Sequence, residues 1–134
     1  MKRRISLFIL ILLWSVVPSI GANIPPDVAN DLMAKNFPSY PQSIYCIGTL
    51  EMGVRFASNK APEIVRIWYQ DKLPDWSVMD TYGTWVLYDG PADASPPAVM
   101  SRKQITIMKN ENLPSWHGLS ADMTTEIMMA FPKQ

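Results

Sequence analysis

The segment from Ala61 to Trp76 constrains the fold of this chain more than any other part of the sequence. Its apolar residues follow the i, i+3, i+4, i+7 spacing of one stripe of an α-helix: Ala61, Ile64, Val65 and Trp68. Pro62 suits the first helical position, and Pro74 pushes the residue before it out of the helical region. The segment therefore predicts a helix over residues 62–73, which needs a sheet to pack against because so short a helix is marginal alone.

Segments with strand-like alternation lie on both sides of this helix. Residues 49–57 alternate so that Leu50, Val54 and Phe56 would face one side. Four further segments are predicted as strands: 76–81, 84–88, 99–109 and 123–131. Tyr82-Gly83 is expected to form a tight turn, and residues 27–36 a short N-terminal helix.

These elements predict an α+β fold. Because successive strands joined by short turns pair antiparallel, we expect one curved antiparallel sheet of about four or five strands. The 62–73 helix would pack across one face of that sheet. No internal repeat or linker divides the chain, so residues 23–134 are expected to form a single domain.

The first 22 residues have the three parts of a secretory signal peptide. Lys2, Arg3 and Arg4 are followed by an uncharged apolar run and then by small residues near Gly21. The run, residues 5–17, is shorter than the roughly 20 residues that span a bilayer, although a retained anchor is the alternative. We expect export to the periplasm or the cell exterior, with cleavage near residue 21 or 22 and no membrane span afterwards.

The charge balance argues against nucleic acid as a partner. The whole chain has twelve basic and twelve acidic residues, and loss of Lys2, Arg3 and Arg4 leaves a net charge of −3. A nucleic-acid-binding protein needs a basic face to neutralise phosphates.

Most of the mature chain resembles a class of uncharacterised small exported bacterial α+β domains. The resemblance covers residues 37–131 and rests on five short motifs: FPSYPQS, APEIVRIWYQDKLPDWS, TWVLYDG, KQITI and TEIMMAF. Such domains often carry glycine where this chain has Gln42 and Asp75. The resemblance implies the fold and the exported location, and it assigns no catalytic or binding residue.

Few residues could carry chemistry. Cys46 is the only cysteine and His117 the only histidine, so a cysteine nucleophile with a histidine base could only be this pair. The preferred interpretation is that Cys46 is a small buried hydrophobic residue and that His117 is an unrelated loop residue. The acidic residues lack calcium-loop spacing, and the methionines lack the clustering of a Cu(I) site. We therefore expect no cofactor, no metal and no enzymatic activity.

Aromatic residues and loops suggest where a partner could bind. Trp116 and His117 lie in a predicted loop at residues 110–121, where the indole either covers the core or is free to contact a partner, and Trp76 is a third candidate. A second loop at residues 91–98 is proline-rich, is expected to be neither helix nor strand, and could form one rim with the first.

Two functions are compatible with these features. The preferred one is a non-catalytic envelope protein that binds an envelope protein or cell-wall component through a sheet face or the loop rim. The alternative is a carrier of a small apolar ligand, with a pocket between helix and sheet. That pocket would be lined by Met52, Phe56, Trp68, Ile105 and Ile127.

Overall fold

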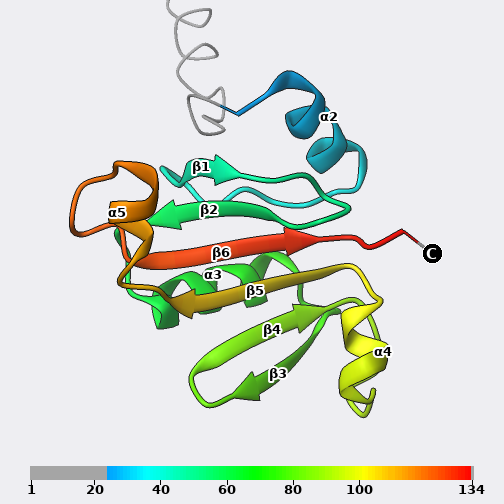
Figure 1. Ribbon diagram of the computed structural model, residues 1–134. Coiled ribbons are helices and arrows are strands. Elements are labelled where there is room, and N and C mark those ends of the chain that lie inside the picture. The colour runs from blue at the N-terminus through cyan, green and yellow to red at the C-terminus, as the bar shows by residue number, and fades with distance from the viewer. Residues whose placement is uncertain (1–23, 134) are drawn as a thin grey trace, which may run out of the picture.

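A six-stranded antiparallel sheet, with the strand order β1-β2-β6-β5-β4-β3, organises the computed structural model, which describes residues 24–133 (Figure 1). The strands are β1 (Ile44–Ile47), β2 (Val54–Ser58), β3 (Ser77–Thr81), β4 (Thr84–Tyr88), β5 (Gln104–Lys109) and β6 (Thr125–Ala130). The helices are α2 (Pro26–Ala34), α3 (Pro62–Lys72), α4 (Pro96–Met100) and α5 (Leu113–His117). The predicted signal peptide, residues 1–22, lies outside the described residues.

The α+β class and the antiparallel sheet are confirmed, but the expected four or five strands are six among the described residues. Strands β3 to β6 pair consecutively, as expected for a meander. The last strand then pairs with β2, which joins the meander to a β1–β2 hairpin. Sequence proximity alone does not reveal this pairing, because nearly 70 residues separate the two strands.

The predicted strand at residues 49–57 is wrong in its first half. Residues 49–52 form a turn in which the Thr49 carbonyl accepts hydrogen bonds from the N–H groups of Met52 (3.2 Å) and Gly53 (2.6 Å). Gly48 and Gly53 flank it with φ values of 105° and 110°, a region that L-residues rarely adopt. The alternating apolar residues therefore wrap around a hairpin end, and the strand begins only at Val54.

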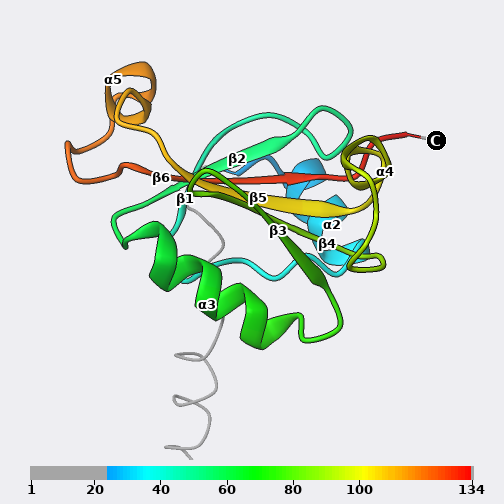
Figure 2. The same ribbon diagram turned by 90° about the horizontal axis from the view of Figure 1, so that it is seen from below.

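Helix α3 crosses one face of the sheet, as predicted, although it ends at Lys72 and its buried stripe is rotated (Figure 2). Val65 and Tyr69 are its buried residues, whereas Ile64 is 53 % exposed. Tyr69 can be buried because its hydroxyl has a hydrogen-bonding partner in the core. Trp68 is half-buried and packs edge-on against Tyr40, with ring centroids 5.3 Å apart.

The main core fills the space between α3 and the inner face of the sheet. Register pairs place Val54, Met129, Ile105 and Leu87 in one inner row across four strands. A second inner row contains Phe56, Ile127 and Ile107. Helix α2, somewhat shorter than predicted, adds Val28 and Leu32 to this core. Leu50 is buried despite its place in a turn, and its carbonyl accepts the N–H of Phe131 (2.8 Å).

Two short helices lie on the opposite, outer side of the sheet from α3 (Figure 2). The prediction that residues 91–98 exclude a helix is wrong, because Pro96 and Pro97 fit the first turn of α4 and the Ser95 hydroxyl caps the N–H of Ala98. Val99 is buried in this helix, so β5 begins at Gln104 and not at residue 99. The second predicted loop contains α5, which ends at the left-handed Gly118.

Among residues 24–133, no helix combines the length and the hydropathy that a membrane crossing requires.

Candidate functional site

The three aromatic and histidine candidates do not come together. Trp116 lies on α5 and is 62 % exposed, so its indole does not cover the core. His117 beside it is half-buried. Trp76 packs into the main core on the inner side of the sheet, edge-on to Phe37 with ring centroids 6.2 Å apart. Trp116 and His117 therefore share a surface, and Trp76 belongs to the other side.

The two loops proposed as one rim lie at opposite ends of β5. Residues 91–98 lead into α4 before β5 begins, and residues 110–121 follow β5 and contain α5 (Figure 1). The full length of the strand separates α4 from α5. No single rim combines them, but the outer face of the sheet connects them.

The five positions proposed for an apolar pocket differ in burial. Phe56, Ile105 and Ile127 are at most 1 % exposed, and Met52 stands 87 % exposed in the hairpin turn. Surface hollows of about 360 to 530 Å³ occur in the described part of the chain, and they are lined by other residues. Phe56, Ile105 and Ile127 therefore belong to the packed core between helix and sheet.

A strip of apolar and polar side chains crosses the outer face of the sheet. Cross-strand partners share a face, so the register aligns one residue from each of five strands: Met79, Val86, Thr106, Met128 and Arg55. Met108 lies beside this row on β5, opposite Glu126. We call these seven residues the outer strip. Its three methionines are partly buried, and Val86, Thr106 and Glu126 are buried.

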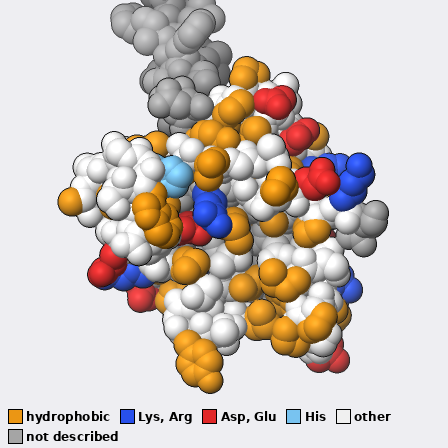
Figure 3. All heavy atoms as spheres, viewed as in Figure 1, with side chains coloured by type: hydrophobic (Ala, Val, Ile, Leu, Met, Phe, Trp, Pro, Cys, Tyr) orange, Lys and Arg blue, Asp and Glu red, His pale blue; other side chains and the backbone are white. Residues whose placement is uncertain are grey.

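Helix α4 covers the Val86 end of the outer strip, and helix α5 flanks its other end. Val99 of α4 packs on Val86 and Tyr88 at one end, and Leu113 of α5 packs on Ala57 at the other. Hydrophobic side chains gather over β4 and α4 in the space-filling view, and others continue across β5 and β6 (Figure 3). The wet face of an antiparallel sheet is usually polar, so this arrangement is unusual.

One ion pair crosses the outer strip. The Arg55 guanidinium approaches the Glu126 carboxylate to 3.7 Å, and the Asn110 amide donates a 2.8 Å hydrogen bond to the same carboxylate. Glu126 is only 4 % exposed, and its partners keep its buried charge compensated. The strip thus combines adaptable thioethers with one fixed, oriented pair of charges.

Cys46 lies on the same side of the sheet, near Leu113 and Met123. Burial, aided by the charge of Glu126, raises the pKa of its thiol to about 11. Its sulfur donates to the Ile44 carbonyl, 3.6 Å away, and not to His117. A thiol in this setting is protonated at neutral pH, which is the reverse of an activated nucleophile.

Sequence reasoning did not find the outer strip. Five of the six strands contribute one or two residues each, and the strip is recognisable only once the register across these five strands is known. Within residues 24–133, no group of three or more histidine, cysteine, aspartate or glutamate residues could hold a metal ion.

No protein-family model, curated protein or solved structure matches this chain.

Proposed function

We propose that the mature protein is an exported, non-catalytic module that binds another envelope macromolecule through the outer strip. The observation that carries this proposal is the set of three partly buried methionines, Met79, Met108 and Met128, that reach the surface on the outer face of the sheet. An exposed apolar surface of this kind is typical of a binding site, because a protein gains nothing by leaving it in water.

The chemistry of the outer strip favours a protein segment as the partner. Methionine side chains are flexible and polarizable, so they adapt to differently shaped apolar side chains. The Arg55–Glu126 pair would set the orientation of the bound segment, since charges at interfaces contribute more to specificity than to affinity. Export through residues 1–22 would bring the strip to partners in the envelope.

Site-specific photo-crosslinking in intact cells tests the proposal. A photoreactive residue replaces Met128 in one variant and Met33 in another, because Met33 is a more exposed methionine that lies on α2. We expect a discrete crosslinked species from position 128 and none from position 33. A protein crosslinked at 128 should lose its affinity for the Met128→Glu variant and keep it for Met33→Glu.

Two results would contradict the proposal. Equal crosslinking at both positions would show that position 128 is merely exposed, and no crosslinking at 128, 79 or 108 would show that the strip contacts nothing. Mass spectrometry of the secreted or periplasmic protein tests the exported location separately, because cleavage should leave an N-terminus near residue 22 or 23.

A further inference from the structure

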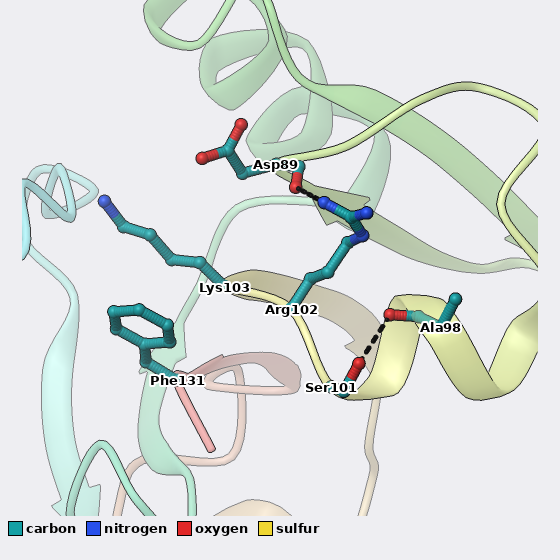
Figure 4. Close-up of a pocket in the computed structure, with 6 residues that line it drawn as sticks. All are labelled: Asp89, Ala98, Ser101, Arg102, Lys103 and Phe131. Carbon is teal, nitrogen blue, oxygen red and sulfur yellow. Dashed lines mark hydrogen bonds between the residues drawn. The ribbon is translucent and has the colours of Figure 1, made fainter. Parts of the chain in front are cut away.

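A second surface lies at the end of the sheet where β6 ends and β5 begins. Basic side chains surround the ring of Phe131 there. One hollow of about 410 Å³ is lined by Asp89, Ala98, Ser101, Arg102, Lys103 and Phe131 (Figure 4). A neighbouring hollow of about 360 Å³ shares Phe131 and adds Lys35. We call the two together the Phe131 pocket. Ala98 is the residue of the predicted loop rim that lines this pocket.

The ammonium groups of Lys35 and Lys103 lie over aromatic rings, and neither forms a salt bridge in the described part of the chain. The Lys103 Nζ is 5.2 Å from the ring centroid of Phe37 and 5.8 Å from that of Trp76. The Lys35 Nζ is 5.5 Å from that of Phe131. The ion pairs within residues 24–133 are Arg55–Glu126 and Lys109–Glu111, so neither lysine takes part in one.

Arg102 and Asp89 complete the Phe131 pocket. The Arg102 guanidinium donates a 3.0 Å hydrogen bond to the Asp89 carbonyl, and its side chain lies against Gly90, where a Cβ would come within 2.7 Å of it. Figure 4 shows the Lys103 ammonium and the Asp89 carboxylate on the same side of the pocket, with the Phe131 ring beside the lysine stem. Burial lowers the pKa of Lys103, Asp89 opposes this shift, and the charge of Lys35 adds to it.

The residues that line the Phe131 pocket carry a net charge of +1, which one bound monoanion would neutralise. Four basic residues (Lys35, Arg102, Lys103 and Lys133) and three acidic residues (Asp31, Glu51 and Asp89) line the two hollows, which leaves one positive charge in excess. A monoanion placed between the two ammonium groups would relieve their repulsion, and the ring offers an apolar surface beside it.

We propose that the Phe131 pocket binds a carboxylate monoanion that carries an apolar or aromatic body. Its carboxylate would lie between Lys35 and Lys103, and its body against Phe131. This site is separate from the outer strip, so either proposal can fail without the other.

NMR titration of the labelled mature protein with 3-phenylpropionate tests the assignment. The expected result is saturable shifts at amides around Phe131 and Lys103. The neutral analogue 3-phenylpropanol should bind at least about tenfold more weakly, because the charge-assisted contacts are absent. Equal binding of the alcohol would overturn the proposal, as would tighter binding of inorganic phosphate at the same amides, since the site would then select a phosphate.

Matched variants locate the site. Lys103→Met keeps the apolar stem but removes the charge, and Lys72→Met is the control, because the Lys72 Nζ also lies over an aromatic ring, 5.5 Å from that of Trp68. We expect binding of 3-phenylpropionate to weaken about tenfold in Lys103→Met and in Lys35→Gln, and to be unchanged in Lys72→Met. Unchanged binding in the first two, with the amide spectrum of a folded protein, would overturn the proposal.

Discussion

The hydroxyl oxygen of Tyr69, in the middle of α3, accepts a 3.1 Å hydrogen bond from the backbone N–H of Tyr40. Both side chains are buried, and their rings lie 6.3 Å apart. The bond ties the crossing helix to the extended segment that leads into β1. It also explains why the helix buries Tyr69, whereas the amphipathic pattern of the sequence predicted that Ile64 would be buried.

Replacement of Tyr69 by phenylalanine should destabilise the protein by about 1–3 kcal/mol, because the Tyr40 N–H would remain buried without an acceptor. Urea unfolding followed by tryptophan fluorescence measures this change. Tyr45→Phe is the control, since the Tyr45 hydroxyl donates a 2.9 Å bond to the Gly48 carbonyl in a partly exposed place. A loss in Tyr69→Phe no larger than in Tyr45→Phe would contradict the interpretation.

The same tyrosine should make stability fall at alkaline pH. Burial, the largest cause, raises the pKa of Tyr69 well above its ordinary value of 10.0, so the folded protein keeps the phenol protonated while the unfolded chain releases the proton. Above pH 10 the unfolded state binds fewer protons, and the contribution of Tyr69 declines by about 1.4 kcal/mol per pH unit. The stability difference between wild type and Tyr69→Phe should therefore be constant below pH 9 and narrow above pH 10. A difference that stays constant to pH 11 would disprove this.

Iodoacetamide labelling of Cys46 should proceed slowly at neutral pH and reach half its maximal rate near pH 11, because burial raises the pKa of the thiol from 9.0 to about 11. Glu126→Gln should move the midpoint to lower pH, since the Glu126 charge contributes to the shift. The protein unfolded in urea serves as the control, with a midpoint near 9. A native midpoint near 9 would contradict the effect of burial, and only one well below 9 would restore the hypothesis of a reactive cysteine.

Local signals in the sequence were enough for some elements and insufficient for others. Proline at position 62 and the apolar spacing behind it predict α3, and Tyr82-Gly83 predicts the β3–β4 hairpin, whose turn residues both have positive φ. The turn at residues 49–52 was missed because its apolar residues alternate as a strand does. The turn differs from a strand in the positive φ values of Gly48 and Gly53. Glycine permits positive φ but does not require it, so the residue type alone does not predict the turn.

The candidate sites were beyond local reasoning for a related reason. The outer strip depends on the pairing of β6 with β2, and the Phe131 pocket depends on α2, α4 and the end of β6 meeting at one place. Each contributing residue has an ordinary local context. Trp116 and His117 are candidates in the sequence because they lie together in a predicted loop. In the structure, no described residue makes a ring contact with either.

Gly48→Ala should be far more destabilising than Gly83→Ala, although both glycines have positive φ. A Cβ at Gly48 would lie 1.9 Å from the Gly53 carbonyl oxygen, whereas nothing lies within 4 Å of one at Gly83. The second substitution should therefore cost only the conformational penalty of about 1–2 kcal/mol, and the first should also force the β1–β2 hairpin apart. Chemical denaturation of the two variants compares them directly. Similar losses would show that the hairpin ends do not approach as closely as described.

Gln42→Gly should stabilise the protein. Gln42 follows Pro41 in a turn closed by the Ser43 N–H and the Tyr40 carbonyl (3.2 Å), and its φ of 62° lies in the left-handed region. Proline followed by a left-handed residue is the pattern of a type II turn, which favours glycine at this position. The exposed Gln42 side chain gives up little, so relief of about 1–2 kcal/mol of strain should outweigh the roughly 0.5–1 kcal/mol of added chain entropy. Thermal unfolding should show a midpoint raised by a few degrees for Gln42→Gly and lowered for Gln42→Val, because a β-branched residue tolerates positive φ least. The reverse order would mean that this turn does not hold its left-handed residue in solution.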